Sequence, residues 1–408
     1  MVIIINCMNN GQRFSALYVR DFRLFWFGQV ISLSGTWMHS VAQSWLVYSL
    51  TKSPLYLGII ASLSALPILL FALFGGIVAD RYPKRNILII TQILSVIPAL
   101  IVGVLADKQL VTIWHMGIIA FFLGTVNAFD IPARQAFLAE VVNKADITNA
   151  IALNSAAFNG ARIIGPILAG FIIAAYGIPT CFYLNAASFI PVIIFMWMIR
   201  AKGQLKAYST GMYEGIVDGW RFVKKERPIF CIMSLIAVFS LFGVPYLTLM
   251  PVLAEEIFHK GAAGLSYLIA SAGTGSFIAA MTLAFRGDVE RKDFYIPFAG
   301  IVFSLAVLGI AFSPNFYLSM ALVFIAGWGV VSFLATGNSF IQNTVPDALR
   351  GRVMSLYTIV FLGFAPLGNS MVGFMADIFG AMESLRIFAV LCLGGSLIFA
   401  QRFRRLLC

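Results

Sequence analysis

The sequence predicts an all-α membrane protein in which twelve transmembrane helices form two pseudo-symmetric six-helix bundles. Composition is the first of three observations behind this prediction: 60% of the 408 residues are hydrophobic and 11% are charged, whereas a soluble domain carries about 25% charged residues. The second observation is the regular recurrence of long apolar segments along the chain. The third is a set of glycines that returns in the same register in both halves.

Each apolar segment has roughly the 20 residues that a helix needs to cross the hydrocarbon core of a bilayer. In chain order the segments are Leu24–Leu50, Leu55–Ala79, Ile87–Ala106, Leu110–Phe129, Ile147–Tyr176, Cys181–Ile199, Ile229–Ala254, Gly264–Phe285, Phe294–Phe312, Phe316–Ile341, Val353–Ala376 and Leu385–Phe399.

The basic residues predict how these segments are oriented. Of the 28 Lys and Arg residues, Arg162 falls inside a segment, and only Lys52, Lys108, Lys260 and Arg386 fall on the side opposite the N-terminus. Cytoplasmic connections are enriched in Lys and Arg, so we expect both chain termini in the cytoplasm. The net charge of +11 has the same origin, and we expect no nucleic-acid partner.

Several classes of protein do not fit this sequence. The five cysteines are scattered, with no CxxC pair and no histidine at metal-ligand spacing, so we expect neither disulfides nor a metal site. An enzyme in the membrane would need a His/Cys/Asp cluster or a glycine-rich phosphate loop, and a sensor or assembly protein would normally add a soluble domain. We therefore expect no enzyme activity and no cofactor.

The longest hydrophilic break, Arg200–Arg227, predicts a linker between the two bundles. Its residues Ile216, Val217, Trp220 and Val223 have helical spacing, which is typical of an amphipathic helix on a membrane surface. We therefore expect a first bundle over residues 1–200, a cytoplasmic linker over 201–227 and a second bundle over 228–408.

The internal repeat relates the two bundles. Glycines of the fifth segment recur in register in the eleventh segment, as Gly160, Gly165, Gly170 and Gly177 and then Gly363, Gly368, Gly373 and Gly380. Repeated halves in a membrane protein of this size predict alternating access around a site near the bilayer midplane.

Two stripes of small residues predict close helix packing. They are Ala157, Ala161, Gly165 and Ala169 in the fifth segment, and Ala272, Ser276, Ala280 and Ala284 in the eighth. We expect these two segments to line the seam between the bundles, and the alternative is packing within each bundle.

A charged turn, Gly75–Arg85, connects the second and third segments. Asp80 lies at a helix C-terminus and Lys84 and Arg85 lie at a helix N-terminus, so each charge opposes its own helix dipole. Charges in this position favour partners elsewhere, which predicts a latch. The alternative is a solvated cytoplasmic loop.

These residues resemble the major facilitator superfamily. The charged turn fits its signature at Gly76, Asp80, Arg81, Lys84 and Arg85, with Pro83 where the pattern has glycine. The fifth segment, with Gly160, Gly165, Pro166 and Gly170, is similar to the antiporter signature of exporters. Three further stretches, Asp21–Trp26, Pro132–Phe137 and Pro346–Ser355, are similar to the enterobactin-exporter-like and macrolide-efflux branch.

The resemblance implies a transporter of the bacterial inner membrane that exports siderophores or drugs as a monomer, driven by the proton gradient. Uptake or lipid translocation in the same fold, or a non-transporting sensor, are the alternatives. The resemblance also implies that Asp80 faces the backbone at Gly351, Arg352 and the residues to Met354, and that Lys84 or Arg85 pairs with Asp130. This latch would close the cytoplasmic side in the outward-open state.

Arg162 is the one charge deep within a segment, where a charge costs at least ~2.5–3.5 kcal/mol. It is a candidate for binding an anionic substrate or for responding to a proton, and the alternative is a structural arginine. His39, near Gln43, is a candidate for titration or a neutral donor between helices. No acidic residue lies at mid-membrane, so His39 and Asp130 are the candidate proton carriers. Further candidates for the cavity wall are Asn127, Asn154, Tyr246, Asn338 and Tyr357.

Overall fold

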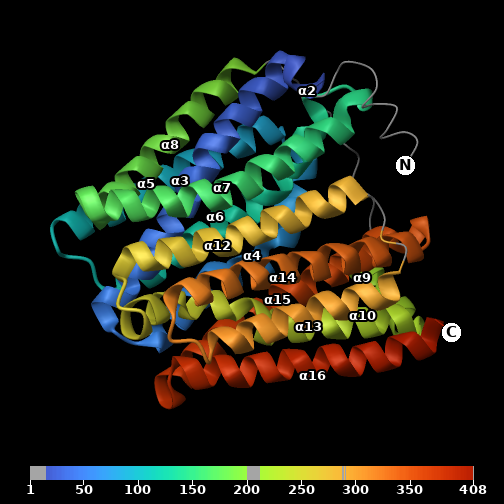
Figure 1. Ribbon diagram of the computed structural model, residues 1–408. Helices are drawn as coiled ribbons and strands as arrows, with labels where there is room; N and C mark the ends of the chain where they lie inside the picture. The colour runs from blue at the N-terminus through green and yellow to red at the C-terminus, as the bar shows by residue number, and fades with distance from the viewer. Residues whose placement is uncertain (1–14, 200–211, 287–288, 290, 408) are drawn as a thin grey trace.

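The computed structural model describes residues 15–199, 212–286, 289 and 291–407, and helices occupy almost all of these ranges (Figure 1). The first bundle consists of α2 (Ser15–Tyr18), α3 (Arg20–Thr51), α4 (Pro54–Arg81), α5 (Lys84–Asp107), α6 (Ile113–Glu140), the short turn η1 (Lys144–Asp146), α7 (Ile147–Tyr176) and α8 (Ile178–Met198).

The second bundle begins with a helix of irregular pitch. Its parts are α10 (Arg227–Val238), η2 (Phe239–Gly243), η3 (Val244–Leu249), α11 (Met250–Val252) and η4 (Leu253–Ile257). It continues with α12 (Gly261–Arg286), α13 (Lys292–Ile310), α14 (Phe316–Thr344), α15 (Asp347–Phe379) and α16 (Ala381–Leu407).

The predicted all-α membrane fold is confirmed. Among the described residues, 11 helices are long and apolar enough to cross a membrane, the irregular helix counting as one over Arg227–Ile257. The remaining long helix, α3, has 32 residues and spans about 48 Å. Its hydropathy is lower because it carries polar residues along its middle, namely Ser32, Ser34, Thr36, His39, Ser40, Gln43 and Ser44. All twelve predicted segments are therefore helical.

Several helices extend beyond the predicted apolar segments. Helix α6 continues to Glu140, α15 begins at Asp347 and α16 continues to Leu407. Hydropathy marks only the part of a helix that lies in lipid, so the sequence prediction stopped where polar residues begin. The helices themselves continue because backbone hydrogen bonding does not depend on apolar side chains.

The linker helix α9 (Met212–Lys225) packs on the second bundle. A Cβ atom at Gly219 would lie 3.2 Å from the backbone carbonyl oxygen of Arg352 at the start of α15. Val223 is buried, and Trp220 is half-exposed with its ring edge-on to Phe230. Residues 200–211 of the predicted linker, and the side chains of Ile216 and Val217, lie outside the described residues.

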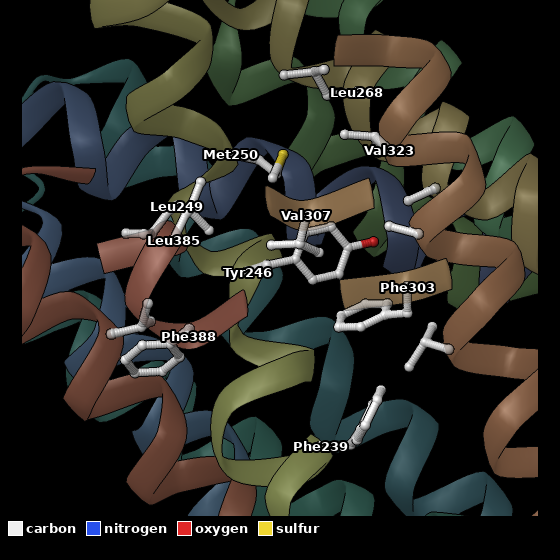
Figure 2. Close-up of a cluster of buried hydrophobic side chains, with 14 of the residues drawn as sticks. Phe239, Tyr246, Leu249, Met250, Leu268, Phe303, Val307, Val323, Leu385 and Phe388 are labelled. Carbon is white, nitrogen blue, oxygen red and sulfur yellow. The ribbon is translucent and has the colours of Figure 1, made fainter. Parts of the chain in front are cut away.

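Proline explains the irregular helix. Pro245 and Pro251 lack the backbone N–H that a regular α-helix requires; Pro245 lies in a 3-10 turn that follows a π-turn, and a second π-turn follows Pro251. Figure 2 shows the result, in which Tyr246 enters the second bundle's core beside Val307 and Phe303. The rings of Tyr246 and Phe303 meet edge-on with centroids 5.6 Å apart.

The seam between the bundles is formed by two helix pairs, α4 with α15 and α7 with α12 (Figure 1). A Cβ atom at Gly273 of α12 would lie 2.6 Å from the carbonyl oxygen of Arg162 in α7. A Cβ atom at Gly170 of α7 would lie 2.8 Å from the Cβ of Ser266 in α12. The prediction that the fifth and eighth segments line the seam is confirmed.

The two stripes of small residues pack mostly against helices of their own bundle. Packing within each bundle was the alternative prediction. A Cβ atom at Gly165 would lie 2.5 Å from the Cβ of Trp37 in α3. In the second bundle the Ser276 hydroxyl donates to the carbonyl of Gly327 in α14, 3.2 Å away. The stripes identified the correct helices and the wrong faces, because small residues serve every close crossing in a membrane bundle.

Candidate functional site

The two ends of the molecule differ in how the bundles meet. We call the end with the α4–α5 turn, α9 and the α14–α15 connection the basic end, and the other the opposite end (Figure 1). At the opposite end a Cβ atom at Gly58 of α4 would collide with the carbonyl oxygen of Asn369 and lie 3.1 Å from the Cα of Gly373 in α15. At the basic end, Cβ atoms at Gly76 and Gly351 would meet no atom within 4 Å.

Polar contacts reinforce the closed opposite end. Tyr48 donates a hydrogen bond to Glu256, and Lys52 lies 3.5 Å from the Glu255 carboxylate. Two further contacts join α4 to α15: the Ser53 hydroxyl donates to Asp377 at 2.6 Å, and the Ser62 hydroxyl donates to the Pro366 carbonyl at 2.5 Å. No pattern in the sequence indicated that these acids bind residues of the other bundle.

A pocket of about 390 Å³ lies between the bundles on the basic side of these contacts, and we call it the central pocket. Helices α3, α4, α6 and α7 supply most of its wall, and the second bundle adds Leu247, Thr248, Ile269 and Ala272. Its polar side chains are Thr36, His39, Ser40, Gln43, Ser44, Ser64, Asn127, Arg162 and Thr248. The pocket lies where the repeat predicts a midplane site.

A second pocket of about 640 Å³ lies in the first bundle and extends along α6 to Leu138 and Ala139 at the basic end. We call it the inner pocket. The two pockets share a wall formed by Thr36, Trp37, His39, Leu123 and Asn127. The two pockets adjoin, and their lining residues extend from Leu138 and Ala139 at the basic end to Val47 and Leu57 near the closed contacts.

Arg162 lies in the wall of the central pocket, as a cavity residue should. Its guanidinium stacks over the Trp37 ring with 5.4 Å between the guanidinium carbon and the ring centroid. Tyr246 of the second bundle lies close enough to interact with it electrostatically, and the buried Tyr246 hydroxyl has no hydrogen-bond partner among the described residues. None of the residues that line the central pocket is acidic.

His39 is buried in a hydrogen-bond network between α3 and α8. Its Nε2 lies 3.1 Å from Oε1 of Gln43, and its Nδ1 lies 3.2 Å from the Asn185 amide nitrogen. The Asn185 nitrogen donates a hydrogen bond to Nδ1. The ring proton is therefore on Nε2, which donates a hydrogen bond to Oε1 of Gln43. Because both ring nitrogens have partners in the neutral ring, this geometry favours the interpretation of His39 as a neutral donor between helices.

Asp130 is the one carboxylate among the described residues that is fully buried, with 2% of its surface exposed. One oxygen accepts hydrogen bonds from Thr91 at 2.7 Å and Gln92 at 3.1 Å, and the other pairs with Arg134 one turn along α6. Arg134 also donates to Gln29 of α3, and its Nε has no partner among the described residues. This cluster forms part of the inner pocket wall.

The charged turn finds partners, but Asp130 is not among them. Lys84 is buried and lies 2.7 Å from the Glu140 carboxylate at the end of α6. Arg85 donates to the carbonyls of Met196 and Trp197 at 2.6 and 2.7 Å. The predicted pairing of Lys84 or Arg85 with Asp130 is therefore wrong in this conformation. Both basic side chains reach the C-terminal ends of neighbouring helices, where the helix dipole favours positive charge.

Asp80 and Gly351, the two sides of the predicted latch, are exposed, and a Cβ atom at Gly351 would meet no atom within 4 Å. The exposed Arg81 lies in the same turn, and Arg352 is in contact with α9. Among the described residues Asp80 makes no hydrogen bond or ion pair with the start of α15, and the resemblance assigns that contact to the outward-open state.

The remaining candidates divide between the pockets and other contacts. Asn127 lines both pockets and Asn154 lines the inner one. Asn338 and Tyr357 line neither of the two pockets. Asn338 instead accepts a hydrogen bond from Gln342 along α14, and the Tyr357 ring stacks on Phe361. In α7, Gly160 faces open space, Gly165 and Gly170 allow close helix crossings, and Pro166 is buried. Sequence reasoning did not single out Trp37 or Arg134, although polar residues in α3 and α6 were the available signal.

Comparisons with known proteins agree with this architecture. Residues 12–405 match the family described as transmembrane secretion effector. The chain is 27% identical to the staphyloferrin A transporter of Staphylococcus aureus, covering 90% of this chain and 92% of that one. It is 26% identical to the multidrug efflux pump Tap of Mycolicibacterium fortuitum, with 94% and 96% covered.

Solved structures show the same fold at low sequence identity. A bacterial homologue of the lysosomal transporter Spinster, in an inward-facing and unoccupied conformation, aligns with a TM-score of 0.72 at 12% identity, covering 98% of each chain. A transporter of the POT family aligns with a TM-score of 0.77 at 11% identity, covering 95% of this chain and 96% of that one. The chain belongs to the transmembrane secretion effector family of major facilitator superfamily transporters.

Proposed function

We propose that this protein exports a small amphipathic molecule, a siderophore or a drug, from the bacterial cytoplasm by alternating access with proton antiport. The central pocket is the observation that carries the proposal, since it lies between two related bundles and is closed at one end. The name of one relative, a multidrug efflux pump, supports efflux as the direction, and the staphyloferrin A transporter is a relative whose name gives no direction.

The positive-inside rule supports the orientation. The connections at the basic end carry most of the Lys and Arg residues, so we assign this end and both termini to the cytoplasm. In that orientation the structure is inward-open. An exporter loads its substrate in this state, and the passage through the inner pocket provides the route. One chain contains the complete passage, which supports a monomer as the working unit.

The latch gives the second state of the proposed cycle. Closing the cytoplasmic end would bring Asp80 toward the N-terminus of α15 near Gly351, where the helix dipole favours a carboxylate. The opposite end would separate at the Gly58–Gly373 crossing. The α4 and α15 backbones are in close contact there, because Gly58 has no side chain to hold them apart. The repeat supports this exchange, because it gives both ends related helices.

Asp130 is our candidate for the antiported proton. Protonation would remove the charge that Arg134 now neutralises and would leave a half-buried cation beside the inner pocket. A buried ion pair that loses one charge is strongly destabilised, so protonation and a change of conformation would be coupled. The neutral hydrogen-bonded geometry of His39 favours Asp130 over it.

The test is accumulation of compounds in cells with and without the gene, under iron limitation and across a drug panel. Export predicts lower accumulation of at least one compound in cells that contain the protein, and an uncoupler should abolish the difference. Unchanged accumulation of every compound, with the protein present in the membrane, would contradict export. Higher accumulation would show uptake instead.

A further inference from the structure

We infer that Arg162 binds an anionic oxygen group, such as a carboxylate, on the transported molecule, so that the substrate is an amphipathic organic anion. This inference rests on the proposed transport function and names its substrate class. The first observation is the uncompensated charge of Arg162. No described residue forms an ion pair with Arg162, and no acidic side chain lines the central pocket. A cation this deep in the membrane costs several kcal/mol unless it has a counter-charge, which a bound anion would supply.

The position of Arg162 is set by the seam. Gly273 of α12 packs against the Arg162 backbone, so the second bundle occupies the space behind the helix at this point. The side chain extends over Trp37, and its guanidinium carbon makes a cation–π contact with the ring at 5.4 Å from the centroid. The planar fork of guanidinium N–H groups matches the two oxygens of a carboxylate.

Neutral hydrogen-bonding groups line the central pocket together with Arg162. Hydroxyl and amide groups of Thr36, Ser40, Gln43, Asn127 and Thr248 line the same pocket. Such groups can bind further oxygens of a substrate without repelling its charge. The Tyr246 hydroxyl, a buried donor with no partner among the described residues, does not line this pocket and lies in the core of the second bundle.

The rest of the pocket wall is apolar, with Leu57, Ile60, Leu123, Leu247 and Ile269. Its volume of about 390 Å³ is within the usual range of roughly 300–1,000 Å³ for small-molecule sites. The lining therefore offers polar groups for an anionic head and apolar surface for an apolar body. A lipid-like or cationic drug would find no acidic partner among these residues.

The test uses purified protein in lipid nanodiscs and a matched pair of probes, 4-phenylbutyrate and its neutral amide. We expect the carboxylate to raise the thermal midpoint of the wild-type protein and the amide to raise it much less. Arg162→Gln should weaken carboxylate binding by about tenfold or more, since it removes a charge-assisted hydrogen bond. Arg162→Lys keeps the charge without the planar fork and should give an intermediate result.

Arg386→Gln is the control, because Arg386 lies at the opposite end of the second bundle and pairs with Glu383. Equal shifts for acid and amide, or carboxylate binding that survives in a folded Arg162→Gln protein, would overturn the inference. Because binding is measured without transport, an absence of export in cells would contradict the proposed function and leave this result standing. If export is observed, Arg162→Gln should reduce the export of anionic compounds and spare neutral ones.

Discussion

The ion pair between Lys84 and Glu140 shows how burial changes the worth of a charged residue. Lys84 is 4% exposed and Glu140 is 17% exposed, and the second Glu140 oxygen already has no partner among the described residues. Removing the lysine would leave a carboxylate without a counter-charge in a poorly hydrated site. The sequence predicted that Lys84 pairs with a group elsewhere in the protein, because its charge opposes the dipole of its own helix. It could not identify Glu140, because the partner is set by how α5 crosses α6.

We predict that Lys84→Ala lowers the free energy of unfolding by about 3–5 kcal/mol, the usual cost of breaking a buried pair from one side. The matched control is Lys52→Ala, which breaks a pair with Glu255 in which the lysine is 58% exposed and should cost at most about 1 kcal/mol. Denaturant or thermal unfolding in detergent would measure both. Equal losses in the two variants would contradict the role assigned to burial.

Asp130 carries the prediction about energy coupling. Asp130→Asn removes the charge while an amide can still accept from Thr91 and Gln92. We expect a folded protein that no longer builds a substrate gradient from a pH gradient, with at least about a tenfold loss in pumping, because the proton site is absent. Counterflow exchange in proteoliposomes should persist. Asp107→Asn, at an exposed acid at the end of α5, is the control, and full pH-driven transport by Asp130→Asn would exclude Asp130 as the proton carrier.

At the scale of helices, the sequence predicted which elements exist better than it predicted which faces meet. Apolar length was sufficient to find every spanning helix, including α3, whose polar residues later proved to be cavity wall. The stripes of small residues identified α7 and α12 as seam helices, yet Gly273 and Gly170 make the crossing. The face that a helix presents to each neighbour depends on tertiary packing. It cannot be predicted directly from one sequence.

The α4–α15 crossing gives a prediction at this scale. Gly58→Ala would place a methyl group against the Asn369 carbonyl and the Gly373 backbone, which should hinder closure of the opposite end. We expect a Ser40→Cys reporter in the central pocket, in a background without native cysteines, to become reactive toward an impermeant maleimide from outside the cell.

Gly76→Ala is the matched control for this experiment. Its added methyl group would meet no atom within 4 Å in the present conformation. It should therefore leave the reporter protected from the outside, as in the wild-type protein. A reporter that stays protected in a stably folded Gly58→Ala protein would show that this crossing does not hold the opposite end closed.

At the scale of the whole molecule, the two ends are in opposite states. The opposite end is held by contacts from Tyr48, Lys52 and Ser53 to the second bundle, while the basic end opens into the inner pocket. The repeat predicted two related bundles, and the orientation that the basic residues indicate stays a prediction. They could not predict the conformation, because a protein that alternates between two states encodes both in one sequence. The repeat does not predict the substrate either, because the substrate would be recognised by side chains from several helices.

The central claim is that the two ends open and close in opposition, and distance measurements between spin labels test it directly. One pair of labels, on Tyr82→Cys and Thr344→Cys, spans the basic end, and the other, on Lys108→Cys and Asn315→Cys, spans the opposite end. All four positions are exposed. Introducing Asp130→Asn, which mimics the protonated carboxylate, should change the populations of both pairs, so that one distance shortens as the other lengthens. Distances that change in the same direction, or at one end alone, would contradict alternating access in this protein.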